Sequence, residues 1–260
     1  MLKLYHSTTS VCAMKARLIL EEKGLPWESE LLDLQRGDQH RPEYLKLNSN
    51  AVVPTLVHDG RVVLESTLII EYLDEAFPAT ALMPAEPWGR AQARLFMKKI
   101  DDHLHAATST VTFAAAFRAH FLSLPPDELC SRLARIPDPA YRERQRRSIE
   151  QGLDAPHVAP ALHQFDRYFG EMEDALARGG YLAGDGYSLA DAAATPYVNR
   201  AGMLGMEALW SRRPHLDAWR ERVMQRPNFA PAVTKWFTDA DRERFNVDRG
   251  AVNRALKGLR

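Results

Sequence analysis

The chain has 260 residues, of which 45% are hydrophobic and 26% are charged. This apolar content supports folded cores and excludes a disordered chain. The length favours two domains, because one domain usually holds about 100–200 residues. Lysine plus arginine and aspartate plus glutamate both number 34, so the net charge is zero. Since nucleic acids and anionic membranes attract basic proteins, we expect neither as a partner.

The two cysteines, Cys12 and Cys130, are too few for a disulfide framework and suit a reducing compartment. No apolar run approaches the roughly 20 residues of a membrane span. The chain begins with Met-Leu-Lys-Leu-Tyr, which is typical of a strand and not of a signal peptide. These features predict a soluble, cytoplasmic protein.

The first 60 residues alternate between strand and helix patterns. Residues 2–5 predict a strand, and a polar loop at 6–10 follows it. A helix is expected from Val11, with Lys15 and Arg17 among the charged residues around an apolar face, and Gly24 is expected to end it. Residues 28–34 predict a second strand, and residues 42–47 predict one or two helical turns.

A hairpin is the clearest local signal. Residues 53–58 and 61–64 flank Asp59-Gly60, a pair that favours a tight two-residue turn. Residues 66–76 then predict an amphipathic helix whose apolar face includes Leu68, Ile69, Tyr72 and Leu73. A strand–helix–strand crossover followed by a hairpin predicts a small mixed sheet of four strands with helices packed on it.

Residues 77–87 contain three prolines and predict an interdomain linker. Beyond it the pattern is helical at 88–122, 160–178, 189–204 and 214–225, so we expect an all-helical second domain. Residues 138–150 are dense in arginine and glutamate and predict a solvated helix or insertion. The expected division is residues 1–78, a linker at 79–87, and residues 88–260.

Three polar segments should meet at one end of this sheet, where ligands of such sheets collect. They are the loop that ends in Ser10, the Val53–Pro54 step, and Glu65-Ser66 at a helix start. A helix N-terminus binds carboxylates, Glu65 can pair with an ammonium group, and a cis bond before Pro54 would expose backbone groups for another peptide. Alternatively, Ser10 and Ser66 are simple helix caps and Pro54 merely starts a strand.

These segments together resemble the thioredoxin-like domain of the glutathione transferases. The loop from Tyr5 to Cys12, the Val53–Pro54 step and the Glu65-Ser66 pair stand where that family holds glutathione. The remainder resembles the family's all-helical domain, including Ser188-Leu189-Ala190-Asp191, which is similar to its N-capping box. The resemblance implies an α/β thioredoxin-like N-terminal domain with a mixed four-stranded sheet, followed by an all-α C-terminal domain.

The resemblance also implies an enzyme that uses glutathione as cosubstrate and attacks a small hydrophobic electrophile. Ser10-Val11-Cys12 is similar to the serine-type theta and zeta classes, with Ser10 in the position of the catalytic hydroxyl. A hydroxyl that donates a hydrogen bond to sulfur favours the nucleophilic thiolate. Cys12, at the same helix start, is either a nucleophile or a small buried residue. His40 is the candidate for the glycine carboxylate of glutathione.

The electrophile pocket should be lined by the long helix after the linker, where Phe96, Asp101, His105, Thr108 and Thr112 follow the spacing of one face. Of these, Asp101, His105 and Thr108 are the pocket residues that we predict. A homodimer is implied as well, with Ile70, Phe96 or their neighbours near its interface.

Several alternatives remain open. The segment from residue 100 to 114 and the arginine-rich insertion resemble bacterial glutathione-dependent beta-etherases, so cleavage of aryl ethers competes with simple conjugation and with zeta-like isomerisation. A non-catalytic glutathione-binding module is a further alternative. We expect no metal site, because the histidines of Asp102-His103-Leu104-His105 are two residues apart and would point to different sides of a helix.

Overall fold

The computed structural model describes residues 1–136 and 138–258, and the chain forms two compact units. The sheet unit consists of Met1–Met97, Arg178–Pro196 and Trp219–Thr238. The helical unit consists of Lys98–Ala177, Tyr197–Ala218 and Asp239–Arg260. The linear division at residues 79–87 that the sequence favours stays a prediction.

The sheet unit is built on a mixed sheet of four strands, as the sequence predicts, and the strand order is β2-β1-β3-β4. Strand β1 (Leu2–His6) runs parallel to β2 (Trp27–Leu31) and antiparallel to β3 (Thr55–His58). Strand β3 pairs antiparallel with β4 (Arg61–Val63). The turn between them has φ of 48° at Asp59 and 79° at Gly60, and positive φ at both positions is the geometry of a type I′ hairpin.

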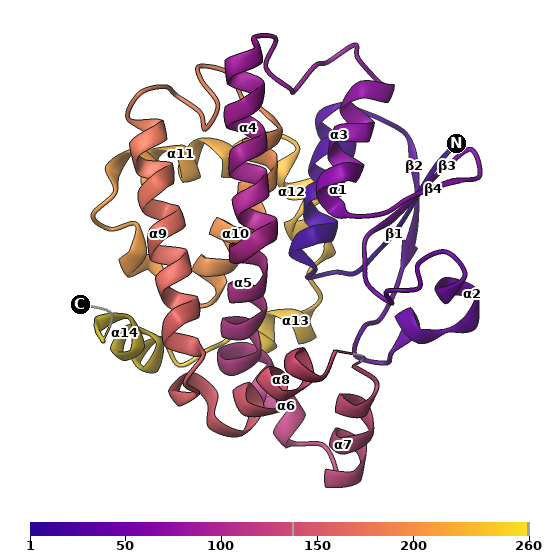
Figure 1. Cartoon of the computed structure of the whole chain (residues 1–260), viewed down its shortest axis with the longest axis vertical. Helices are drawn as coiled ribbons and strands as arrows, with labels where there is room; N and C mark the ends of the chain where they lie inside the picture. The colour runs from indigo at the N-terminus through magenta and orange to yellow at the C-terminus, as the bar shows by residue number, and fades with distance from the viewer. Residues whose placement is uncertain (137, 259–260) are drawn as a thin grey trace. The chain divides into compact units, whose positions relative to one another are not determined.

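Helices α1 (Val11–Glu22) and α3 (Ser66–Ala76) lie side by side against the sheet (Figure 1). Helix α1 ends as predicted, because Gly24 adopts φ of 61° and the amides that follow the helix bond back to its last carbonyls. Strand β2 ends three residues earlier than predicted. The carboxylate of Asp33 accepts the amides of Gln35 and Arg36 and so begins a turn there.

The predicted faces of these two helices need correction. The sequence predicts Lys15 and Arg17 among the charged residues around the apolar face of α1, yet both side chains are fully buried. Leu68 was expected on the apolar face of α3, yet it is 59% exposed, while Ile69, Ile70 and Leu73 are buried. Helix α1 is therefore covered on more sides than an amphipathic helix with a single buried face.

The segment after α3 is held to the sheet unit by a buried ion pair. The Lys23 ammonium lies 2.7 Å from the Asp74 carboxylate, and both side chains are almost completely buried. Asp74 also accepts the amides of Leu82 and Met83, at 2.8 and 2.9 Å. Charge-assisted hydrogen bonds of this kind order a proline-rich stretch that has no regular structure of its own.

The rest of the described chain is predominantly helical, and its short β-bridge joins Tyr181 to Gly184. The sequence predicts the positions of α4, α5, α6, α8, α9, α10 and α11, whereas it does not single out α7, α12, α13 and α14. The α-helices not yet given are α2 (Pro42–Leu45), α4 (Pro87–Lys99), α5 (His105–Thr112), α6 (Arg118–Leu122), α7 (Pro126–Ala134), α8 (Pro139–Gln151), α9 (Val158–Leu176), α10 (Leu189–Met203), α11 (Pro214–Met224), α12 (Phe229–Ala232), α13 (Asp239–Arg244) and α14 (Arg249–Lys257).

Two π-helical stretches, Ile100–Leu104 and Phe113–Phe117, flank α5. Among the described residues, no helix combines the length and the apolar character needed to cross a membrane.

The predicted capping box lies at the start of α10. The Asp191 carboxylate accepts hydrogen bonds from the amide and the hydroxyl of Ser188, at 2.9 and 2.7 Å. It also accepts the amide of Leu182 and the indole N–H of Trp219, at 3.0 and 2.8 Å. The carboxylate thus reaches back three residues, as the sequence pattern indicates.

Candidate functional site

Strand register brings the three predicted segments to one end of the sheet. Tyr5 of β1 pairs with Thr55 of β3, so the loop that follows β1 leaves the sheet beside the start of β3. Leu56 of β3 pairs with Val63 of β4, so Glu65 follows β4 at the same end. The Ser10 loop, the Val53–Pro54 step and the Glu65-Ser66 pair are therefore neighbours in the sheet unit.

Ser10 occupies the N-cap of α1. Its hydroxyl oxygen accepts the amide of Ala13 at 3.2 Å. A hydroxyl that accepts one hydrogen bond still has its own O–H to donate, so capping and donation to a sulfur are compatible. Cys12, in the first turn of the same helix, is a half-buried thiol. Both residues lie at the positive end of the α1 dipole.

The Val53–Pro54 peptide bond is cis. A chain of buried side chains holds the turn before it, where Tyr44 Oη lies 2.8 Å from Thr55 Oγ1 and within hydrogen-bond distance of the Val52 carbonyl. The Asn48 amide donates to the same carbonyl at 3.0 Å and to Thr55 Oγ1 at 3.1 Å.

The direction of each of these bonds follows from the atoms involved. A carbonyl only accepts, so Tyr44 donates its proton to Val52. Thr55 must then donate to Tyr44, while it accepts from Asn48. Burial raises the pKa of Tyr44, which keeps the phenol protonated as a donor. Each of these hydrogen bonds therefore has a defined donor and a defined acceptor.

The start of α3 combines a strained residue with positive charge. Glu65 stands at the N-cap with φ of 64°, its side chain makes no capping hydrogen bond, and it is exposed. Left-handed φ is uncommon for a residue with a side chain and clusters at functional sites. Ser66 is the first helical residue and is 7% exposed. The buried Lys15 ammonium donates to Thr67 Oγ1 at 3.1 Å, which adds a cation to the helix N-terminus.

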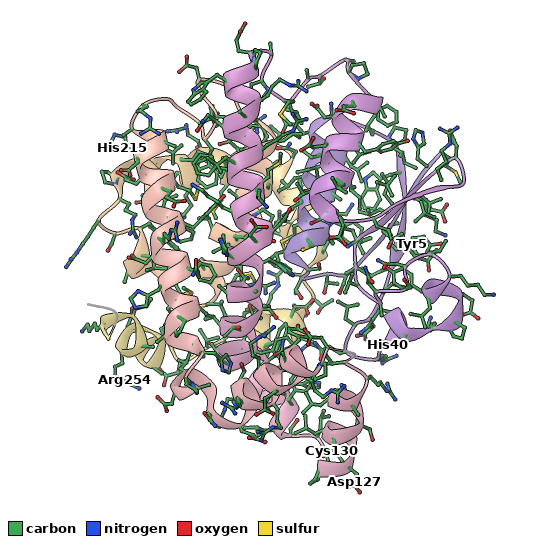
Figure 2. The ribbon with its side chains drawn as sticks, in the orientation of Figure 1. Tyr5, His40, Asp127, Cys130, His215 and Arg254 are labelled. Carbon is green, nitrogen blue, oxygen red and sulfur yellow. The ribbon has the colours of Figure 1, made fainter. Side chains whose placement is uncertain are left out.

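His40 lies in the short turn Asp38–His40, directly before α2 (Figure 2). It is half-buried, and its amide donates to the Gly37 carbonyl at 2.9 Å. Its assignment to the glycine carboxylate stays a prediction.

Within the part of the chain that the structure describes, no group of three or more His, Cys, Asp or Glu side chains is arranged to hold a metal ion.

The predicted electrophile residues lie in the helical unit. Asp101 and His105 are exposed, and His105 Nδ1 lies 3.2 Å from the hydroxyl of Tyr197. Thr108 is 1% exposed, and its hydroxyl donates to the Leu104 carbonyl at 2.7 Å. Asp101 belongs to the first π-helical stretch, and such stretches are frequent at functional sites. The pocket role of all three stays a prediction.

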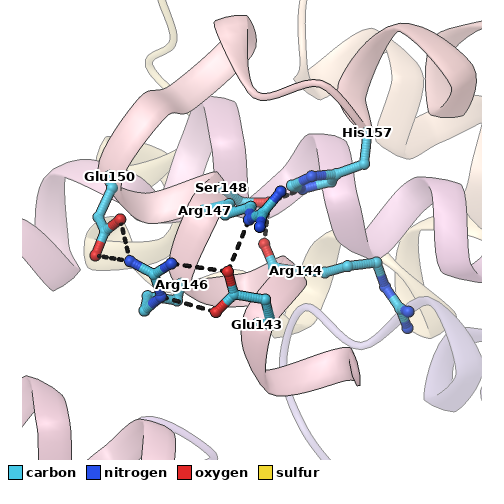
Figure 3. Close-up of polar contacts among 7 residues, drawn as sticks. All are labelled: Glu143, Arg144, Arg146, Arg147, Ser148, Glu150 and His157. Carbon is cyan, nitrogen blue, oxygen red and sulfur yellow. Dashed lines mark hydrogen bonds and ion pairs between the residues drawn. The ribbon is translucent and has the colours of Figure 1, made fainter. Parts of the chain in front are cut away.

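The arginine-rich stretch forms helix α8, in which both glutamates pair with arginines of the same helix (Figure 3). Arg146 bridges Glu143 and Glu150 at 2.7 and 2.6 Å, and Arg147 also contacts Glu143 at 2.7 Å. The two guanidinium groups lower the pKa of Glu143 to about 2. A helix with so many internal ion pairs is typical of a solvated surface and does not point to a phosphate site.

Sequence reasoning missed the residues that hold the site loops. Tyr44, Asn48 and Thr55 fix the turn before Pro54, and Arg17 contacts the backbone of the Ser10 loop. A signal exists for Arg17, because it lies three residues after Met14 and so falls near the apolar face of α1. No pattern marks the other three as polar groups turned inward.

Two family models match the chain. The model described as the glutathione S-transferase N-terminal domain matches residues 4–81, and that of the C-terminal domain matches residues 139–227. The protein LigF of Sphingobium sp. strain SYK-6 is 31% identical over 249 residues, which cover 93% of this chain and 95% of LigF. A tetrachloro-p-hydroquinone reductive dehalogenase of Sphingobium chlorophenolicum is 32% identical over 236 residues, covering 88% of this chain and 94% of that enzyme.

Solved structures agree with this likeness. The crystal structure of the beta-etherase LigF from Sphingobium sp. strain SYK-6 has a TM-score of 0.80 to this chain at 30% sequence identity. The match covers 90% of this chain and 99% of the LigF chain. Similarity therefore extends over both the sheet-containing N-terminal region and the helical remainder.

Proposed function

The chain belongs to the glutathione S-transferase family, and from this premise we propose that Ser10 activates the glutathione thiol for attack on a small hydrophobic electrophile. The chain is a glutathione transferase with glutathione as its cosubstrate. Val53 and Pro54 hold the peptide backbone of glutathione. Glu65 and Ser66 hold its γ-glutamyl end, and His40 serves the glycine carboxylate.

The observation that carries this proposal is the convergence of these segments at one end of the sheet. The γ-glutamyl group has one ammonium and one carboxylate, which fit the exposed Glu65 carboxylate and the N-terminus of α3 beside buried Lys15. A thiol with a pKa near 8.5 is only a few per cent thiolate at neutral pH. Donation from the Ser10 hydroxyl at a positive helix end lowers that pKa.

The electrophile is proposed to react at carbon. The thiolate forms an S–C bond, and the group that leaves takes the electrons of the broken bond. The named activities of two relatives, a beta-etherase and a reductive dehalogenase, make aryl ethers and aryl halides the first compounds to test. Zeta-like isomerisation and a non-catalytic glutathione-binding module are the alternatives. The electrophile is proposed to contact Asp101, His105 and Thr108.

Calorimetric titration with glutathione tests the binding part. Loss of a charge-assisted hydrogen bond costs about 1.5–3 kcal/mol, so Glu65→Ala should weaken affinity about tenfold or more. Glu75→Ala is the matched control, because Glu75 is an exposed carboxylate near the other end of α3. Unchanged affinity in Glu65→Ala would remove this residue from the site.

Turnover separates an enzyme from a binding module. Thiol consumption should be measured with an aryl ether, an aryl halide, an epoxide and an isomerisable double bond. Consumption or isomerisation with any of these supports catalysis, and each outcome names the substrate class. Tight binding of glutathione with no reaction in all four assays would favour the module.

We place the protein in the cytoplasm as a homodimer. The two cysteines are thiols, which suits a reducing compartment. The resemblance implies that Ile70, Phe96 or their neighbours lie near the interface, and Ile70 and Phe96 themselves are 0% and 6% exposed. Their neighbours Leu68 and Leu95 are 59% and 44% exposed, and exposed apolar side chains on adjacent elements favour association. Light scattering should give twice 29.4 kDa, and Leu68→Lys should shift the particle to the monomer mass. A monomeric wild type would contradict the dimer.

A further inference from the structure

Arg17 is a fully buried cation whose guanidinium contacts the loop that carries Ser10. Its Nη1 donates to the Ser7 carbonyl at 2.9 Å, and its Nη2 donates to the Thr8 carbonyl at 3.1 Å. Its Nε donates to the Ala232 carbonyl at 2.6 Å. All of these residues belong to the sheet unit. One side chain of α1 thus joins two consecutive peptide groups of the loop to a segment more than 200 residues away.

His6, the last residue of β1, completes this contact. Its Nδ1 lies 3.0 Å from Arg17 Nη1 and its Nε2 lies 2.7 Å from Ser29 Oγ. Because a guanidinium only donates, Nδ1 must accept, so the imidazole proton resides on Nε2 and points to Ser29. Burial, assisted by the charge of Arg17, lowers the pKa of His6 to about 3. The ring is therefore a neutral acceptor for Arg17 at ordinary pH.

The remote segment is Phe229–Trp236, which contains α12 and a 3-10 turn. Its Phe229, Ala232 and Val233 share a buried cluster with Met14 and Leu18 of α1. The Trp236 ring lies 5.4 Å from the Arg17 guanidinium carbon and 4.5 Å edge-on from His6. Packing and cation–π contact thus hold the guanidinium in place while it binds the loop.

We propose that Arg17 is a positioning residue for the reaction, which sets the conformation of the Ser7–Ser10 loop and so the aim of the Ser10 hydroxyl at the glutathione sulfur. The proposal rests on the function assigned to Ser10 above. The segment Phe229–Trp236 supports the loop, because its Ala232 carbonyl accepts a hydrogen bond from the guanidinium and its Trp236 ring makes a cation–π contact with it.

Peptide geometry explains how Arg17 acts. The peptide bonds after Ser7 and Thr8 are trans, so each amide N–H points away from the carbonyl that faces Arg17. Rotation of either peptide would leave a carbonyl and a guanidinium N–H unpaired, in a buried place at Ser7 and a half-buried one at Thr8, which is costly. A lysine cannot replace this fork, because its single ammonium does not match several acceptors in a fixed planar arrangement.

Arg17→Lys tests the proposal, with Lys23→Met as the matched control. Lys23 is also a buried cation of this helical segment, and it bonds to Asp74 and to the Phe77 and Thr80 carbonyls, not to the Ser10 loop. Both variants should lose stability, and thermal unfolding will show whether the two losses are of similar size. Each should then be assayed for the pKa of bound glutathione thiol, for glutathione affinity, for kcat, and for hydrogen exchange of the amides at residues 7–10.

In Arg17→Lys the pKa of the bound thiol should rise by about one pH unit or more, and kcat should fall about tenfold or more, the size expected for a misplaced donor to an anion. Glutathione affinity should change less than about threefold, since the other contacts survive. Loop amides should exchange about tenfold faster. Lys23→Met should keep the wild-type thiol pKa and the wild-type loop exchange.

Unchanged loop exchange in Arg17→Lys would overturn the positioning role, and so would equal effects in Lys23→Met. A wild-type protein that leaves the thiol pKa of bound glutathione at its solution value would instead refute the function assigned to Ser10. The exchange data distinguish the two failures, because they report loop conformation without any reaction.

Discussion

Tyr44 gives the sharpest energetic prediction, because its hydroxyl is one link in the hydrogen-bond chain before Pro54. Tyr44→Phe leaves the Val52 carbonyl with its second bond, from Asn48 at 3.0 Å. It leaves the fully buried Thr55 hydroxyl without an acceptor. One lost neutral hydrogen bond and one buried unsatisfied donor should together cost about 1–2.5 kcal/mol of unfolding free energy.

A double-mutant cycle checks this mechanism. Thr55→Val removes the orphaned hydroxyl, so the Tyr44→Phe/Thr55→Val protein should lose less stability than the sum of the single variants, with a coupling of about 0.5–1.5 kcal/mol. Urea unfolding provides the free energies, and calorimetry should show weaker glutathione binding in Tyr44→Phe because the turn before Val53 is loosened.

Tyr72→Phe is the control for that cycle. It removes a hydroxyl that lies 2.7 Å from His58 Nδ1, at the opposite end of β3, so glutathione affinity should not change. Additive single costs, or equal effects of Tyr44→Phe and Tyr72→Phe on glutathione affinity, would refute the reasoning.

Two further predictions concern stability. Asp191→Ala leaves four buried donors without an acceptor, including those of Ser188 and Trp219. The unfolding free energy should fall by about 3–5 kcal/mol, measured by urea unfolding followed by tryptophan fluorescence. A loss below about 1 kcal/mol would contradict the contacts. Burial lowers the pKa of His6 from its ordinary value near 6.5 to about 3, so the stability that its neutral ring contributes is present above pH 6.5 and is lost as the pH falls toward 3. The unfolding free energy of the wild type should fall by up to about 1.4 kcal/mol per pH unit more than that of His6→Gln in this window. An equal fall of the two unfolding free energies with decreasing pH would contradict the buried neutral ring.

Local patterns predicted the sheet region well because its signals are local. The Asp59-Gly60 turn, the Gly24 helix end and the bounds Ser66–Ala76 depend on residues that are close in sequence. The convergence of the Ser10, Pro54 and Glu65 segments follows from strand order alone, since parallel and antiparallel pairing dictate which strand ends meet.

Long-range packing explains what the sequence did not reveal. Arg17 was expected on a charged face, and it is buried because Ala232 and Trp236 cover it from the far end of the chain. The helical spacing of charged residues does not indicate that a distant segment covers one of them. The sequence does not show that Ile70, predicted with Phe96 or their neighbours to lie near a dimer interface, is buried beside Ile69 and Leu73. The four-residue α12 was not detected because it is too short for a periodic signal.

The central claim is that the Ser10 hydroxyl stabilises the glutathione thiolate. The most direct measurement is the pH dependence of thiolate absorbance in enzyme-bound glutathione, for wild type, Ser10→Ala and Cys12→Ala. Ser10→Ala should raise the pKa of the bound thiol and slow turnover about ten- to a thousandfold, while Cys12→Ala should overlay the wild type. A Ser10→Ala curve that overlays the wild type would contradict the claim, and a shift confined to Cys12→Ala would transfer the role to Cys12.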